Sequence, residues 1–264
     1  MFNLKFSGNT VTQSQLEKIR LVLSTYQDGT GQLARPNGKT LPGWRDFERA
    51  VALAFEGVAQ ESKAIYDVLT PISDNAETNY GISCKMRKLL RSVKRTGRVT
   101  IEVSNSSGRF WNALHAEGIE DYETAPAKAG GILVRLVESW HDKVSLENGG
   151  TTDTRRSFYL VLQWDEKTST YQLYQYPLKL PDPENIFWSA KSRRLIGKDE
   201  QGVLIEWYGH SGGQLKYYPF VKKAIWVSEI FKLEPLPEND EGYGLLHKVR
   251  GYYPELWEIA CHIS

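Results

Sequence analysis

Hydrophobic residues recur at helical spacing in several segments of the first 150 residues, which predicts a set of amphipathic helices. The clearest segment is Gly43–Phe55, where Trp44, Phe47 and Val51 share one helix face. The other helices that this spacing or a basic run predicts are Ser14–Tyr26, Lys88–Lys94, Gly108–Glu117 and Gly131–Lys143.

Short apolar or alternating runs predict strands, and these become frequent after residue 157. The runs are Ser62–Leu69, Tyr80–Arg87, Arg98–Ser104, Phe158–Asp165, Tyr171–Tyr176, Val203–Tyr208 and Gln214–Tyr218. The polar stretch 73–79 joins the first two runs as a hairpin loop. The order predicts an α/β (α+β) fold, with a mixed central sheet flanked by helices and a β-rich C-terminal extension.

A polar, glycine-containing stretch at Glu147–Thr154 predicts a division of the chain into residues 1–150 and 151–264. The first part would carry the N-terminal helices and the hairpin, and the second would be the β-rich extension. Packing of the extension onto the same core is the alternative.

Composition excludes several classes of protein. The 264 residues carry 33 Lys+Arg and 32 Asp+Glu, a formal net charge of +1, and contain no apolar run near the ~20 residues of a membrane span. Two cysteines, Cys84 and Cys261, are too few for a disulfide scaffold or a structural zinc site. No phosphate-binding or dinucleotide glycine motif occurs, so no nucleotide cofactor is expected. We expect a cytoplasmic protein with no membrane partner.

The predicted hairpin carries the candidate chemistry. Alternation places Ser83, Lys85 and Arg87 on one face of the second strand and Cys84 on the other, where it would be a buried hydrophobe. The paired strand would bring Asp67 beside Lys85. A carboxylate that holds a divalent cation, with a lysine that stabilises negative charge, suits hydrolysis of a phosphodiester.

A second acid is needed to complete a magnesium site. Glu102 is the first candidate because it is a lone acid within a short β-branched run. Glu48 is the next, because it lies at the edge of the apolar stripe of its helix, where an unpaired charge is costly. A competing acid-x-Lys frame, Glu61-Ser62-Lys63, has no preceding strand that bears an aspartate.

Residues 43–117 resemble the PD-(D/E)xK nuclease superfamily, and within it the type II restriction endonucleases. Asp67 matches the family's aspartate, Lys85 matches its lysine, and Ser83 stands where an acid is usual. The resemblance implies cleavage of double-stranded DNA at specific sites, with Asp67 and Glu102 holding Mg²⁺. Lys85 would stabilise charge and orient water, Glu48 would support the site, and Ser83 would ligate weakly. A homodimer is implied by the symmetry of such targets.

Basic residues near the hairpin suggest where DNA would bind. Seven lie between Lys85 and Arg98 with no acid among them, and such a run can hold a phosphate backbone. Two glycine-containing segments, 27–39 and 210–216, and one helix start also carry polar groups that suit DNA. The predicted contacts are Arg35, Lys39, Arg87, Lys88, Arg91, Arg109, Gln214 and Lys216.

Three other interpretations remain open at this stage. Asp, Ser and Lys on a hairpin are often only its solvated face. A DNA-binding protein without catalysis would use the same basic run. A β-rich module that binds protein or carbohydrate through aromatic residues would show no salt-sensitive affinity for DNA.

Overall fold

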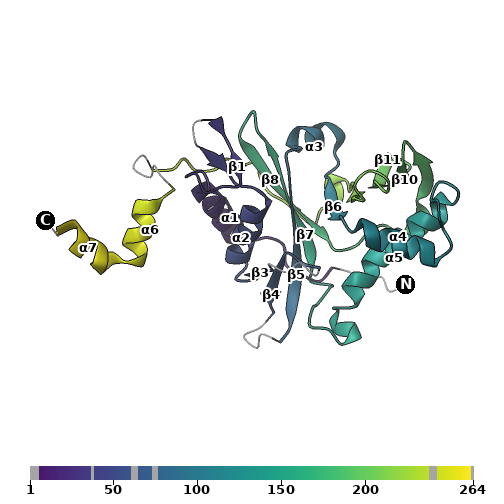
Figure 1. The fold of residues 1–264 in the computed structure, drawn as a ribbon, viewed down its shortest axis with the longest axis horizontal. Helices are drawn as coiled ribbons and strands as arrows, with labels where there is room; N and C mark the ends of the chain where they lie inside the picture. The colour runs from purple at the N-terminus through teal and green to yellow at the C-terminus, as the bar shows by residue number, and fades with distance from the viewer. Residues whose placement is uncertain (1–5, 37–38, 61–64, 73–76, 238–242, 263–264) are drawn as a thin grey trace.

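The computed structural model describes residues 6–36, 39–60, 65–72, 77–237 and 243–262. The fold is mixed α/β, as predicted, and contains a six-stranded mixed sheet and a five-stranded antiparallel sheet side by side (Figure 1). Two two-residue strands, β1 (Leu33–Ala34) and β2 (Thr40–Leu41), form a separate small hairpin. None of the described helices is long and apolar enough to cross a membrane.

The six-stranded sheet has the order β13-β8-β7-β5-β4-β3. Its strands are β3 (Val58–Ala59), β4 (Val68–Pro71), β5 (Asn79–Arg87), β7 (Phe158–Asp165), β8 (Thr170–Pro177) and β13 (Trp226–Val227). The central pair β5 and β7 is parallel, and the other neighbouring strands are antiparallel. The candidate hairpin β4–β5 is therefore joined directly to the strands of the C-terminal half.

Two helices cover one face of this sheet. They are α1 (Gln13–Thr25) and α2 (Trp44–Ala54), and their apolar stripes bury residues such as Ile19 and Phe47 against Ile82 of β5. The start of α1 is fixed by a reciprocal capping box between Thr12 and Gln15. Both helices were predicted from the spacing of their apolar residues, because those residues are the ones buried against the sheet.

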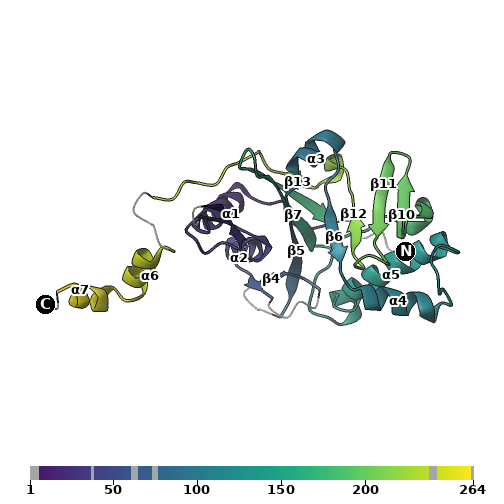
Figure 2. The same ribbon diagram turned by 45° about the horizontal axis from the view of Figure 1, so that its top comes forward.

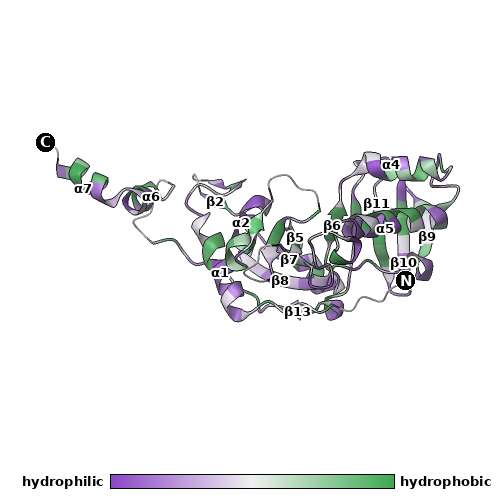
Figure 3. Cartoon of the chain, turned by 90° about the horizontal axis from the view of Figure 1, so that it is seen from below, coloured by the Kyte–Doolittle hydropathy of each residue, from purple (hydrophilic) through white to green (hydrophobic). Residues whose placement is uncertain are grey.

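The five-stranded sheet has the order β6-β12-β11-β10-β9, with all neighbours antiparallel. Its strands are β6 (Ile101–Ser104), β9 (Phe187–Lys191), β10 (Arg194–Asp199), β11 (Gly202–Trp207) and β12 (Leu215–Tyr217). Helices α4 (Ser107–Ala116) and α5 (Pro126–Asp142) cover one face (Figures 2 and 3). Trp207 and Leu215 are buried in the cluster that these helices form with the sheet.

The two sheets share buried contacts. Ile101 of β6 lies in one hydrophobic cluster with Tyr159 and Val161 of β7. Each sheet also takes strands from both sides of residue 150, since β5 pairs with β7 and β6 pairs with β12. The chain passes between the two sheets more than once, and the polar stretch near residue 150 lies in one of these connections, between β6 and β7.

The remaining elements lie at the periphery. They are α3 (Leu90–Thr96), η2 (Leu146–Asn148), η3 (Pro183–Asn185), η4 (Val221–Lys223), α6 (Leu245–Tyr252) and α7 (Pro254–His262). Helices α6 and α7 bury none of their described residues and extend away from the two sheets (Figure 1).

Several element boundaries differ from the sequence prediction. The strand expected at Ser62–Leu69 begins only at Val68, and residues 61–64 lie outside the described part. Helix α5 begins at Pro126, because proline fits the first turn of a helix. The β9–β10 hairpin was not predicted: its turn uses Ser192 and Arg193 at positive φ, without the glycine or asparagine that marks such turns.

Candidate functional site

The structure brings Asp67 and Lys85 together, as the alternation of residues predicts. Val68 pairs with Ile82, so Asp67 lies opposite Ser83 at the start of the β4–β5 hairpin. The ammonium Nζ of Lys85 lies 3.1 Å from Oδ2 of Asp67. The side chains are 9% and 20% exposed for Asp67 and Lys85, so the pair lies mostly out of water.

The Asp67 carboxylate is also held by its neighbours on β5. The backbone N–H of Cys84 donates a 2.8 Å hydrogen bond to Oδ2, and the hydroxyl of Ser83 lies 3.4 Å from the same oxygen. Charge-assisted hydrogen bonds of this kind fix the orientation of a carboxylate. Asp67 is therefore held in place before any ligand arrives.

The face from which Lys85 projects is set by the strand pleat. Cys84 is buried in the core beneath α1 and α2, as predicted for the opposite face. Across the parallel pairing, Lys85 lies beside Val161 and Arg87 lies beside Gln163. The site is thus built on three adjacent strands, of which the third lies far along the chain.

Sequence reasoning missed Gln163. It is fully buried, its amide Nε2 lies 3.4 Å from the carbonyl oxygen of Thr100, and its Oε1 has no hydrogen-bond partner in the described part of the chain. The signal was present, because Gln163 is a single polar residue among apolar ones in the strand Phe158–Trp164. A buried, incompletely paired amide is costly and is unusual in a structural strand.

Glu102 borders the site through Arg87. Its carboxylate forms an ion pair with the guanidinium of Arg87 and accepts a 2.6 Å hydrogen bond from the amide of Asn105. The described residues contain no group of three or more His, Cys, Asp or Glu side chains arranged to hold a metal ion. As it stands, Glu102 is paired with a cation and does not share a ligand set with Asp67.

Glu48 is buried on α2. The helix that bears it packs against the Cys84 face of β5, whereas Lys85 projects from the other face. Ser83 is buried beside Asp67, in the position where the resemblance placed a weak ligand.

Acids from distant segments accompany the basic run. Lys88 forms an ion pair with Glu166 of the β7–β8 turn, Arg91 forms one with Asp165 at the end of β7, and Arg98 lies 2.9 Å from Asp199. These cations therefore have counter-charges from distant segments, although the run itself contains no acid. Pairs with exposed side chains are weak, so a phosphate can compete for such cations.

The other predicted DNA contacts are dispersed over the surface. Arg35 lies 3.6 Å from Glu166, and Arg109 lies 5.6 Å from the ring of Trp140. Lys39 is exposed and Gln214 is partly buried. Lys216 lies on β12, where its Nζ is 4.2 Å from the ring of Tyr208.

Tyr66 and His141 border the site on the N-terminal side of Asp67. Their rings stack with centroids 5.9 Å apart, and Tyr66 packs directly on Gly81 of β5. Burial raises the pKa of the Tyr66 hydroxyl and lowers the pKa of His141 to about 4. Both rings are therefore uncharged at neutral pH.

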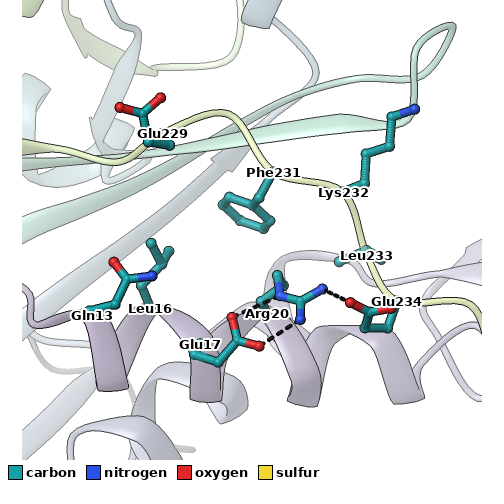
Figure 4. Close-up of a pocket in the computed structure, with 9 residues that line it drawn as sticks. All are labelled: Gln13, Leu16, Glu17, Arg20, Glu229, Phe231, Lys232, Leu233 and Glu234. Atoms are coloured by element: carbon teal, nitrogen blue, oxygen red, sulfur yellow. Dashed lines mark hydrogen bonds and ion pairs between the residues drawn. The ribbon is translucent and has the colours of Figure 1, made fainter.

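Cavities among the described residues lie away from the Asp67–Lys85 pair. One, of about 930 Å³, is lined by residues of α5 and of the 177–183 loop, including His141 and Asp182. Another, of about 440 Å³, lies between α1 and segment 229–234, where Arg20 is held by the carboxylates of Glu17 and Glu234 (Figure 4). The Arg20–Glu234 ion pair beside this cavity joins segment 229–234 to α1.

Comparisons with protein-family models, curated proteins and solved structures found no match to this chain.

Proposed function

We propose that the protein is a metal-dependent endonuclease that hydrolyses phosphodiester bonds of double-stranded DNA, in the manner of a type II restriction enzyme. The observation that carries this proposal is the 3.1 Å contact between Asp67 and Lys85 on adjacent strands of the hairpin. A carboxylate and a lysine on one face of a hairpin are the arrangement that the resemblance to PD-(D/E)xK nucleases requires.

The residues around Asp67 suit this chemistry. The Cys84 N–H fixes the carboxylate, and the Lys85 ammonium beside it would stabilise negative charge that develops on a bound phosphate. Mg²⁺ commonly uses one or two carboxylates and completes its coordination with phosphate oxygens and water. Asp67 fits the role of the single protein carboxylate, and a bound cation would polarise the phosphate and acidify a water.

Glu102 has a conditional role in this proposal. It would join the metal site only by leaving Arg87, and Arg87 would then be free to contact the phosphate backbone. A homodimer is proposed because a symmetric DNA target favours a symmetric enzyme.

The test is cleavage of mixed plasmid and phage DNA by the purified chain, with Mg²⁺ or with EDTA. We expect discrete fragments that require the metal and that disappear in Asp67→Asn and Lys85→Met, both close in size to the native residues. Lys128→Ala, on an exposed residue of α5, is the matched control and should retain cleavage. Cleavage that persists in both site variants would contradict the assignment.

A second function is favoured by one observation. The described residues contain no group of three acids or histidines that could hold a metal, which suits a DNA-binding protein without catalysis. Such a protein would bind DNA with a salt-dependent affinity, cut nothing with any divalent metal, and retain its affinity in Asp67→Asn.

A further inference from the structure

The five-stranded sheet presents one face that α4 and α5 do not cover. These two helices pack against the face that carries Leu195, Trp207 and Leu215. Strand alternation places Arg194, Glu206, Tyr208 and Lys216 on the opposite face. Arg194 belongs to β10, Glu206 to β11 and Lys216 to β12, and Tyr208 directly follows β11. We call these four side chains the open-face group.

Two cations of this group meet one aromatic ring. The guanidinium carbon of Arg194 lies 4.5 Å from the ring centroid of Tyr208, and Nζ of Lys216 lies 4.2 Å from the same centroid. Strands β10 and β12 flank β11 on its two sides, so the cations approach the ring from opposite neighbours. Contact with an aromatic ring orders a cation without neutralising its charge.

The carboxylate of Glu206 is held by two neighbouring hydroxyls. Glu206 accepts hydrogen bonds from the hydroxyls of Tyr208 (3.2 Å) and Tyr218 (2.7 Å), and its side chain is only 14% exposed. The side chain of Arg194 is 43% exposed, and its guanidinium lies 3.6 Å from Glu206. The side chain of Arg194 is thus more exposed than that of Glu206, and Lys216 is partly exposed.

The open-face group is continuous with the candidate hairpin. Lys216 pairs in register with Glu102 of β6 and with Glu206 of β11. Glu102 in turn pairs with Arg87, two residues beyond Lys85 on the same face of β5. One row of polar side chains therefore runs from the strand of Lys85 across the second sheet.

We infer that this open face binds the phosphate backbone of double-stranded DNA, with Arg194 and Lys216 as the phosphate contacts and Tyr208 as the group that positions them. The inference rests on the proposed function for the identity of the polymer. Because both cations lie within 4.5 Å of one ring centroid, they are at most about 9 Å apart. Cations this close can contact neighbouring phosphates of one DNA strand. The contacts supply affinity and orientation rather than sequence selection.

The test measures binding of the full chain to a labelled duplex of random sequence, by fluorescence anisotropy in EDTA over a series of salt concentrations. We expect the double variant Arg194→Gln/Lys216→Gln to bind about tenfold more weakly at 100 mM salt. Its plot of log affinity against log salt should be shallower by about 2, because two phosphate contacts are lost. The charge-conserving double variant Arg194→Lys/Lys216→Arg should restore most of the affinity.

The matched control removes two cations from the helical layer on the other side of the same sheet. Lys128→Gln/Arg135→Gln changes two exposed side chains of α5 and should alter affinity by less than twofold. Equal losses in the two double variants, an unchanged salt slope in the first, or no binding by the unaltered chain would overturn the inference.

Because EDTA removes divalent metal ions, this assay measures DNA binding without cleavage. The binding result can therefore fail or succeed independently of the cleavage test of the proposed function. A chain that binds through the open face but cuts nothing with Mg²⁺ would keep the inference and lose the endonuclease proposal. If the unaltered chain cuts DNA and the Arg194→Gln/Lys216→Gln variant binds DNA normally, the endonuclease proposal is kept and the inference about the open face is lost. Thermal denaturation of both double variants checks that each remains folded.

Discussion

Arg87 of β5 forms an ion pair with Glu102 of β6, and this contact joins the six-stranded sheet to the five-stranded sheet beside the candidate site. The side chains are 36% and 16% exposed, so the pair is more shielded than a typical surface pair. The Arg87–Glu102 contact therefore contributes to how the two sheets are held together.

A double-mutant cycle on this pair should give a coupling energy of about 1 kcal/mol. The proteins are the unaltered chain, Arg87→Gln, Glu102→Gln and the double variant, each unfolded in urea. The exposed pair Lys128–Glu117 is the control, and its coupling should be below about 0.5 kcal/mol. Zero coupling at Arg87–Glu102 would show that the carboxylate is not engaged there and is free for another role.

Gly81→Ala should be strongly destabilising. An added Cβ would lie 2.2 Å from the ring of Tyr66, which is buried and directly precedes Asp67. Overpacking of this kind costs about 1–3 kcal/mol. Gly108→Ala in α4 meets nothing within 4 Å and should be neutral or stabilise by about 0.5 kcal/mol. Urea unfolding compares the two, and equal stabilities would contradict the close packing of Tyr66 on β5.

Stability should fall as the pH is lowered through the range of His141 titration. Burial lowers the pKa of His141 to about 4, whereas the unfolded chain has the ordinary value of about 6.5. Between these values the unfolded state binds more protons, so the free energy of unfolding decreases as the pH falls from about 6.5 to 4. The loss attributable to His141 between pH 7 and pH 5 is about 1–2 kcal/mol.

The variant His141→Phe keeps an aromatic ring against Tyr66 and removes the titrating group. Urea unfolding at several pH values should give it a shallower decline than the unaltered chain shows. Identical profiles would mean that His141 becomes protonated in the folded state near its ordinary pKa.

Gln163→Met should leave stability unchanged or raise it by about 1 kcal/mol. The amide Oε1 is buried without a partner, and replacing it with an apolar group of similar length removes the cost of its desolvation. The readout is the urea midpoint, with Gln175→Met as a contrasting variant. Gln175 donates to the carbonyl of Asn9 and accepts from the N–H of Val11, so its loss should destabilise the protein. Destabilisation by Gln163→Met beyond about 1 kcal/mol would indicate that its oxygen has a partner in solution.

Much of the local structure could be predicted from the sequence. Helices with a strong apolar stripe, such as α1 and α2, and the pleat that places Ser83 and Lys85 on the face opposite Cys84 follow from periodicity alone. The contact of Asp67 with Lys85 needed only the assumption that the two runs form a hairpin.

What could not be predicted depends on contacts between distant segments. The partners of Arg87, Lys88 and Arg91 come from β6 and from the β7–β8 turn, and no local pattern specifies them. Sequence periodicity also does not specify which strands pair, so it could not predict the parallel pairing of β5 with β7. Gln163 was therefore not recognised as a neighbour of the site. Helices α6 and α7 are short and bury none of their described residues, so neither has the buried apolar stripe that α1 and α2 have.

The parallel pairing of β5 with β7 also sets an order of events during synthesis. The β4–β5 hairpin can form from neighbouring residues, but β7 begins at Phe158, about seventy residues after the end of β5. Because strand pairing over such a separation is slow and requires the later segment, Lys85 gains its buried neighbour Val161 only after the residues of β7 have left the ribosome. A growing chain therefore carries the Asp67–Lys85 pair on an incomplete sheet until β7, which ends at Asp165, has emerged.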